Sequence, residues 1–197
     1  GASAAVNQAD GGGATPLYLA CQQGHLECAQ LLLEASAAVN QAADSGATPE
    51  RMGGEEGHRD VVGLLRDAGA SVSQATEDGC TPLLAACQEG HLECAQLLLE
   101  ASASVGQADK DGVTPLFMAC QNGHLECAQL LRDAGADINQ ATQNGATPLF
   151  IACQQGHVEC ARLLLEASAA VGQATEDGAT PLFMACQEGR VECAQLQ

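Results

Sequence analysis

GATPLFIACQQGHVECARLLLEA, at residues 145–167, is the stretch of sequence that decides the fold. Thr147 and Pro148 predict the start of a helix, because threonine caps helix N-termini and proline fits the first helical position. Gly156 predicts a left-handed residue that ends this helix. The apolar residues that follow are spaced three and four apart, which indicates a second helix. The stretch is therefore expected to form two short helices joined by a tight turn.

The same pattern recurs along the chain with a period of 33 residues, as six Thr-Pro pairs and six glycines in one phase. Helices this short are marginal alone, so each unit has to be stabilised by stacking on its neighbours. Because both ends fall inside a unit, we expect a piece of a longer array. The complete units span 10–42, 43–75, 76–108, 109–141 and 142–174, with the tail of a preceding unit at 1–9 and a truncated unit at 175–197.

Each unit resembles the ankyrin repeat, which has the same period and the signature Thr-Pro-Leu-His-x-Ala. The resemblance covers nearly the whole chain. It implies an all-α fold, an ankyrin-repeat α-solenoid of stacked helix-turn-helix units with hairpin or turn connections, as a single domain over residues 1–197. The histidine of the signature is replaced, so that every aromatic residue shares one repeat position, and we interpret these aromatics as packing between helices, with a ligand-stacking surface as the alternative. The six residues at this position are Tyr18, Arg51, Leu84, Phe117, Phe150 and Phe183.

The second unit departs most from the pattern. Glu50 stands where the other units have leucine, and Gly53 and Gly54 replace two small apolar residues. Two glycines inside a helix cost about 2 kcal/mol relative to alanine, and a buried unpaired carboxylate costs more unless it turns outward. We therefore expect this helix to be distorted or to be the most mobile point of the array, as a hinge or a degenerate cap-like unit.

Three units end their second helix differently from the others. Ser36, Ser102 and Ser168 stand where units two and four have glycine. If these serines keep the left-handed conformation of a helix C-cap, each costs on the order of 1 kcal/mol.

Ten of the eleven cysteines form pairs seven residues apart within five units. A metal site or disulfides are conceivable, but zinc sites use four ligands and each unit offers at most three. All ten lie at helical core positions, so we interpret them as buried reduced thiols in an intracellular, cytoplasmic protein. Cys80 lies alone in a loop and is the candidate for a reactive thiol. The pairs are Cys21/Cys28, Cys87/Cys94, Cys120/Cys127, Cys153/Cys160 and Cys186/Cys193.

No residue set predicts catalysis, a metal or a cofactor. Candidate constellations recur in several units, whereas an active site normally occurs once. Five histidines directly follow the capping glycines and are expected to hydrogen-bond turn backbone rather than to act as bases. They are His25, His58, His91, His124 and His157.

The charge of the chain limits its partners. Lys+Arg number 7 against 25 Asp+Glu, which gives a net charge of −18 and excludes a nucleic-acid binder. No apolar run reaches the roughly 18 residues of a membrane span. We expect a monomer in solution whose apolar end faces allow end-to-end stacking of copies.

The resemblance implies that loop tips and the ends of the first helices line a concave face that binds another protein, and the acidic composition favours a basic partner. The alternatives are a structural spacer within a longer array and an engineered repeat scaffold. The resemblance also implies asparaginyl hydroxylation at Asn139, which follows Leu131 at the family's spacing. The predicted partner-binding residues are Glu77, Asp78, Gln88, Glu89, Lys110, Asp111, Gln121, Asn122, Gln143, Asn144, Gln154, Gln155, Glu176 and Asp177.

Overall fold

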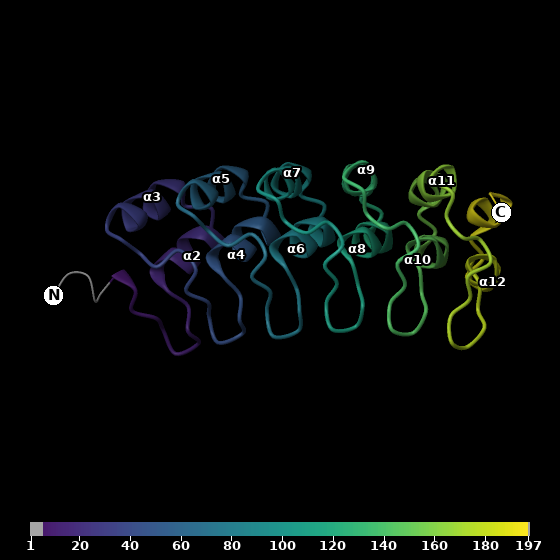
Figure 1. Cartoon of the computed structure of the whole chain (residues 1–197), viewed down its shortest axis with the longest axis horizontal. Coiled ribbons are helices and arrows are strands. Elements are labelled where there is room, and N and C mark those ends of the chain that lie inside the picture. The colour runs from purple at the N-terminus through teal and green to yellow at the C-terminus, as the bar shows by residue number, and fades with distance from the viewer. Residues whose placement is uncertain (1–5, 197) are drawn as a thin grey trace. The chain divides into compact units, whose positions relative to one another are not determined.

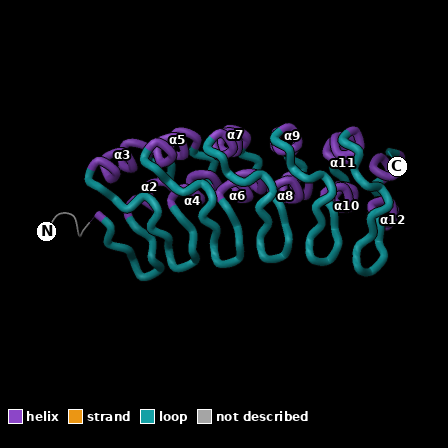
Figure 2. The backbone as a smooth tube through the Cα atoms, viewed as in Figure 1, coloured by secondary structure: helices purple, strands orange, loops and turns teal. Residues whose placement is uncertain are grey.

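A computed structural model of the chain describes residues 6–196. Within this range it contains twelve helices and no strand (Figure 2). Helices alternate along the chain between inner helices, which follow the Thr-Pro pairs, and outer helices, which follow the capping glycines. The inner helices are α2 (Pro16–Gln22), α4 (Pro49–Glu55), α6 (Pro82–Glu89), α8 (Pro115–Asn122), α10 (Pro148–Gln155) and α12 (Pro181–Gln187). The outer helices are α3 (Leu26–Glu34), α5 (Arg59–Asp67), α7 (Leu92–Glu100), α9 (Leu125–Asp133), α11 (Val158–Glu166) and α13 (Val191–Gln195).

The chain divides into two compact units, each built from stacked helix pairs (Figure 1). Unit 1 contains the described residues up to Ala86 together with His91–Ser104, and unit 2 contains Cys87–Gly90 and the described residues from Val105 onward. Within unit 1, α2 packs on α4, and α5 packs on both α3 and α7. Within unit 2, α10 packs between α8 and α12, and α11 packs between α9 and α13. This repeated stacking confirms the all-α solenoid expected from the sequence.

The caps that the sequence predicts are present. Thr147 Oγ1 accepts a hydrogen bond from the Phe150 backbone N–H at 3.2 Å, and the equivalent threonine caps each of the other five inner helices. Gly156 has a φ of 84°, in the left-handed region. Ser36, Ser102 and Ser168 also adopt positive φ values of 65°, 67° and 65°, so the predicted strained caps are confirmed.

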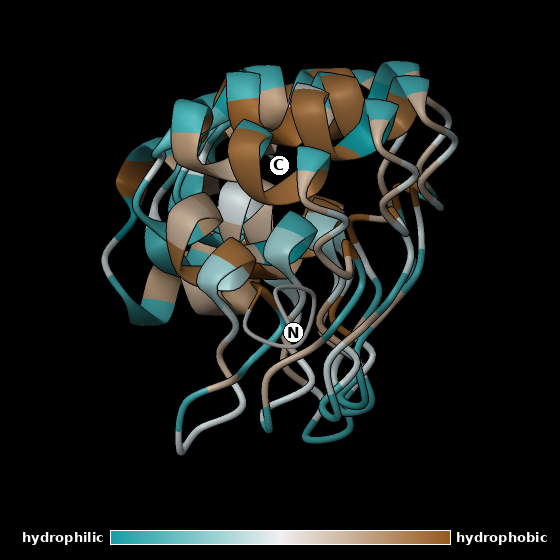
Figure 3. Ribbon diagram, turned by 90° about the vertical axis from the view of Figure 1, so that its left-hand side faces the viewer, coloured by the Kyte–Doolittle hydropathy of each residue, from teal (hydrophilic) through white to brown (hydrophobic). Residues whose placement is uncertain are grey.

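The core of each unit is thin, because single leucines and small residues fill the space between stacked helices. Leu17 and Leu83 of unit 1, and Leu116 and Leu149 of unit 2, occupy one repeat position and are at most 1% exposed. Hydrophobic residues concentrate on the helices, and the loop tips are hydrophilic (Figure 3). None of the helices among residues 6–196 has the length and apolarity that crossing a bilayer requires.

The expected distortion of the second repeat is wrong, because α4 is a regular helix closed by the same backbone bonds as α2. Gly53 makes room for larger neighbours on α5, where Val61 and Val62 replace the cysteine and alanine of the other repeats. A Cβ at Gly53 would lie 3.3 Å from Val62 Cγ2 and 3.5 Å from Val61 Cγ1. The outward turn of Glu50 does not occur either, since its side chain is fully buried.

The expectation that ten cysteines lie in the core is wrong for two of them. Cys28 and Cys186 are exposed, whereas the other eight are buried. Cys28 lies on the first outer helix and Cys186 on the last inner helix, and no further helix pair of the described chain covers them. Cys80, the thiol outside the pairs, is half-buried.

Candidate functional site

A groove of about 430 Å³ lies along the inner helices of unit 2. Its walls come from α8, α10 and α12 and from the hairpins that precede α10 and α12. We call it the inner groove. The lining residues are Phe117, Asn144, Ala146, Phe150, Ile151, Gln154, Thr175, Asp177, Ala179, Phe183, Met184 and Gln187.

Apolar side chains form the floor of the inner groove. Phe117, Phe150 and Phe183 each stand two residues after the proline of an inner helix, so the threonine caps orient them alike. Phe117 and Phe150 are 6% and 8% exposed, which agrees with the predicted packing between helices. Phe183 is 56% exposed, because no inner helix of the described chain follows α12. The aromatic position is therefore a core position that opens into a groove.

Polar groups form the rim. Asn144 and Asp177 come from hairpin tips, whereas Gln154 and Gln187 come from the ends of α10 and α12. Within the described chain, the side chains of Gln154 and Asp177 make no hydrogen bond. The Asn144 side chain accepts hydrogen bonds from Thr142 Oγ1 at 2.6 Å and from the Ala146 N–H at 3.2 Å. Gln154 and Asp177 are thus available to a partner, while Asn144 stabilises its own hairpin.

Backbone hydrogen bonds hold consecutive hairpin tips together in unit 2. The Gln143 N–H donates to the Asp111 carbonyl at 2.8 Å, and the Glu176 N–H donates to the Asn144 carbonyl at 3.0 Å. The Gln143 side chain also donates to the Lys110 carbonyl. A second hollow lies between these tips, lined by Asp111, Val113, Thr142, Gln143 and Asn144.

The structure brings only part of the predicted partner-binding set together. Five of these residues line the inner groove or the adjacent hollow, namely Asp111, Gln143, Asn144, Gln154 and Asp177. Seven others belong to unit 2 but line neither, namely Gln88, Glu89, Lys110, Gln121, Asn122, Gln155 and Glu176. The last two, Glu77 and Asp78, are exposed at a hairpin tip of unit 1.

Some of the residues outside the groove already have structural partners. Asn122 Nδ2 donates to the Gln88 carbonyl at 2.7 Å, and Gln88 Nε2 donates to Glu89 Oε1 at 2.9 Å. The predicted partner-binding set does not contain the apolar floor, which is formed by Phe117, Phe150, Ile151, Phe183 and Met184. The alternative interpretation of the aromatic repeat position as a ligand-stacking surface includes its three phenylalanines, but no signal in the sequence indicates Ile151 and Met184.

The electrostatics of unit 2 are acidic. It carries twelve Asp and Glu residues against four Lys and Arg residues. Asp177 contributes a carboxylate to the inner groove, and none of the groove's lining residues is basic. A cation is therefore favoured at this surface.

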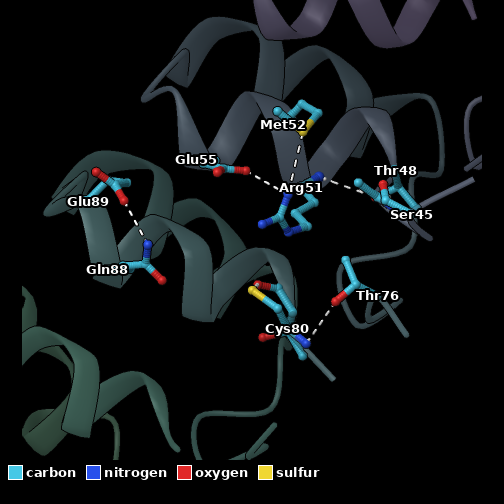
Figure 4. Close-up of polar contacts among 11 residues, drawn as sticks. Ser45, Thr48, Arg51, Met52, Glu55, Thr76, Cys80, Gln88 and Glu89 are labelled. Atoms are coloured by element: carbon cyan, nitrogen blue, oxygen red, sulfur yellow. Dashed lines mark hydrogen bonds and ion pairs between the residues drawn. The ribbon is translucent and has the colours of Figure 1, made fainter. Parts of the chain in front are cut away.

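The same repeat position carries different chemistry in unit 1 (Figure 4). Arg51 replaces the aromatic residue, and its Nη1 forms an ion pair of 2.6 Å with Glu55 Oε2. Nearby, burial raises the pKa of the Tyr18 hydroxyl, although the Arg51 charge opposes this effect. The Cys80 N–H donates to Thr76 Oγ1 at 3.1 Å, and the Cys80 thiol donates to the Thr81 carbonyl at 3.8 Å. Cys80 is therefore held in its hairpin.

The histidines connect neighbouring repeats. His157 Nε2–H donates to the Gln121 carbonyl of the preceding repeat at 3.0 Å, and His124 makes the same bond to Gln88. Each ring lies against the preceding capping glycine, where a Cβ at Gly123 would come within 2.5 Å of His157 Nδ1. The predicted bond to turn backbone is confirmed for His58, His124 and His157, and in each case it joins two repeats. Among residues 6–196, no three His, Cys, Asp or Glu side chains are arranged to hold a metal ion.

Asn139 also joins two repeats, because its Oδ1 accepts a hydrogen bond from the Ala170 N–H at 2.8 Å. Asn40 Oδ1 makes the equivalent bond to the Ser71 N–H in unit 1, also at 2.8 Å. Hydroxylation of Asn139 stays a prediction, which the intact mass after incubation with an asparaginyl hydroxylase would test.

In a comparison with known protein families, the chain matches the family model described as "Ankyrin repeats (3 copies)". It matches three times, over residues 2–76, 52–142 and 135–196, and so covers nearly all of the chain. Comparison with curated proteins gives no significant match.

Proposed function

Because the chain belongs to the ankyrin-repeat family, we propose that it is a non-catalytic module that binds another protein through the inner groove of unit 2. Ankyrin repeats are generally protein–protein interaction modules. The observation that carries the proposal is the combination of an apolar floor and a polar rim with one carboxylate, that of Asp177, in one groove. This combination suits a partner segment that presents an apolar side chain beside basic residues.

Phe183 is the proposed apolar contact. Its ring is 56% exposed and lies in the same groove as the buried Phe150. Aromatic residues are enriched where proteins bind one another. Because the ring is largely outside the core, its removal should weaken binding without unfolding the unit.

Asp177 is the proposed electrostatic contact, with Asp111 in the neighbouring hollow as a second one. Both carboxylates are exposed at hairpin tips and attract basic groups on a partner. Attraction between exposed charges is screened by salt, so binding should weaken as ionic strength rises.

Selection of random peptides displayed on phage against the full chain tests the proposal. Selected peptides should combine basic and apolar residues, and Phe183→Ala or Asp177→Lys should each weaken their binding by roughly tenfold in fluorescence anisotropy. Glu176→Lys changes the same charge on the same hairpin tip outside the groove, and Glu77→Lys does so in unit 1. Equal binding by all four variants, or no selected peptide, would favour the spacer alternative.

An intracellular location belongs to the same proposal. Its support is the high cysteine content of the chain, with eight thiols buried between helices, since thiols stay reduced in the cytosol. Fractionation of cells that produce the full-length protein tests it.

We also propose that copies of the chain stack end to end. Leu182 and Val191 of unit 2 are 41% and 63% exposed, and Leu31 of unit 1 is 65% exposed. Leu149, the repeat equivalent of Leu182, and Leu163, the repeat equivalent of Leu31, are at most 5% exposed, because a neighbouring helix pair covers them. A second copy would cover these faces by the same stacking, and a concentration-dependent mass in sedimentation experiments is the expected result.

A further inference from the structure

Unit 2 contains three contacts between buried thiols, each of which joins two consecutive repeats. The first cysteine of each contact lies near the end of an inner helix. The second lies on the outer helix of the next repeat, 40 residues further along the chain, and a hydrogen bond links the two side chains. The three contacts are Cys87 to Cys127, Cys120 to Cys160, and Cys153 to Cys193. All six side chains are at most 1% exposed.

This arrangement differs from the pairs that the sequence presents. Spacing along the chain groups the cysteines within a repeat, seven residues apart, whereas the hydrogen bonds join them across repeats. In unit 1, Cys21 and Cys94 each lack a cysteine at the repeat position of the partner thiol. The residue 40 positions after Cys21 is Val61, and the residue 40 positions before Cys94 is Gly54. The second repeat therefore confines the thiol contacts to unit 2.

We propose that these three thiol pairs are oxidation sites, at which a two-electron oxidant such as hydrogen peroxide forms a disulfide between adjacent repeats. A hydrogen bond already links the two side chains of each pair, so a disulfide would join side chains that are in contact. The hydrogen bond with Cys120 lowers the pKa of the Cys160 thiol, although burial opposes this. In contrast, the hydrogen bond and burial raise the pKa values of Cys87 and Cys120, and burial raises that of Cys193. The thiolate is the form of cysteine that reacts with oxidants.

At Cys120 and Cys160 the disulfide forms in two steps. The Cys160 thiolate attacks one oxygen of hydrogen peroxide and breaks the O–O bond, which leaves a sulfenic acid and a hydroxide that takes up the thiol proton as water. The Cys120 sulfur then attacks the sulfenic sulfur and displaces its hydroxyl group, which leaves with the Cys120 proton as a second water. The pair loses two electrons and two protons, and one peroxide becomes two waters.

Three such bonds would change the mechanics of unit 2 and leave unit 1 as it is. In a repeat protein each repeat is stabilised by its contacts with its neighbours. A covalent bond at three successive interfaces prevents the repeats from separating, and each bond restricts the unfolded chain as well. Oxidation should therefore make unit 2 more resistant to unfolding.

Peptide mapping of the oxidised full chain tests the proposal. The reduced protein is treated with hydrogen peroxide under native conditions, alkylated with N-ethylmaleimide, digested and analysed by mass spectrometry. We expect three disulfides with the pairing given above and alkylation of the five remaining cysteines. The melting temperature should rise by roughly 5 °C or more and return on reduction with dithiothreitol. Disulfides within a repeat, such as Cys120 to Cys127, or sulfinic acids in place of disulfides would overturn the proposal.

A gain-of-function variant tests whether repeat position determines the pairing. Val61→Cys places a thiol 40 residues after Cys21, and both residues belong to the same buried cluster of unit 1. It should add a fourth disulfide, Cys21 to residue 61. The matched control, Val62→Cys, lies one residue further along the same helix and should add none. A new disulfide in the control but not in the test variant would contradict the argument.

Discussion

Replacement of Glu50 by leucine, the residue at this position in the other five repeats, should stabilise unit 1 and change its response to pH. The Glu50 side chain is fully buried, and neither carboxylate oxygen has a hydrogen-bond partner within the described chain. Burial raises its pKa to about 8, although the charge of Arg66 opposes the shift. Arg66 itself is 3.5 Å from Glu100 and 3.6 Å from Asp67, so other carboxylates already neutralise it.

The groups around Glu50 leave the buried carboxyl without compensation. The thiols of Cys21, in the helix before it, and of Cys94, in the outer helix of the next repeat, both have raised pKa values, mainly through burial and partly through the Glu50 charge. Neither thiol supplies a positive charge. The folded protein therefore carries Glu50 in its neutral form at pH 7, whereas the unfolded chain ionises it.

The magnitude follows from the two pKa values of Glu50, 4.5 for the free side chain and about 8 in the fold. Because the folded state holds the proton more tightly, its stability is complete below pH 4.5 and decreases as pH rises to 8. The difference of about 3.5 units corresponds to roughly 5 kcal/mol over this range, at about 1.4 kcal/mol per unit. At pH 7 roughly 3 kcal/mol has been lost.

The assay is urea unfolding followed by circular dichroism between pH 5 and pH 8.5, with the wild type, Glu50→Leu and Glu50→Gln. The leucine variant should gain roughly 3 kcal/mol at pH 7, and its stability relative to the wild type should increase with pH. The glutamine variant should also remove the pH dependence but gain less, because its amide stays buried without a partner. Exposed carboxylates titrate identically in all three proteins. Parallel pH profiles for the wild type and the leucine variant would refute the reasoning.

Three further predictions concern the caps, the glycines of α4 and the end faces. Ser36→Gly, Ser102→Gly and Ser168→Gly should each raise the free energy of unfolding in urea by about 1 kcal/mol, because each removes a side chain from a residue with positive φ. Gly69→Ser should lower it by the same amount through backbone strain alone, since a Cβ there meets nothing within 4 Å. An unchanged free energy of unfolding in both sets would contradict the strain argument. Gly53→Ala should not gain the ~1 kcal/mol of stability that helix propensity predicts, because the new Cβ lies too close to Val62. The double variant with Val62→Ala should regain part of this stability. A full gain in the single variant would disprove the size compensation. End-to-end stacking should place Cys186 of one copy opposite Cys28 of another. A bismaleimide should therefore cross-link two copies, and Cys28→Ala should abolish the cross-link. Cross-linking that persists in that variant would exclude this geometry.

The fold was predictable because the period, the Thr-Pro caps and the capping glycines are local signals that six repeats report independently. Even the positive φ of Ser36 followed, because its repeat equivalents are glycines. The candidate site was predictable only in part. Asn144 and Asp177 could be assigned to hairpin tips from the sequence, but whether a side chain such as Phe183 is covered depends on what packs above it.

The predicted distortion of α4 does not occur, for a related reason, while its predicted mobility stays a prediction. Helix propensity counts Gly53 and Gly54 as losses, and this is correct for an isolated helix. For Gly53 the gain lies on another helix, where Val61 and Val62 fill the space beside it. Such exchanges of size between neighbours do not show in the propensity of either segment, because core stability depends on total packed volume.

The second repeat therefore differs from the others in its buried chemical groups as well as in its sequence. Gly54 and Val61 each stand where the other repeats have a cysteine, so one thiol is missing from each of two inter-repeat contacts. Glu50 adds a buried acid in the same repeat. Unit 1 consequently contains the group that titrates near neutral pH, and unit 2 contains the thiol pairs. If both arguments hold, a pH change should alter the stability of unit 1 and peroxide that of unit 2. Hydrogen exchange resolved by residue can separate these two responses in one protein.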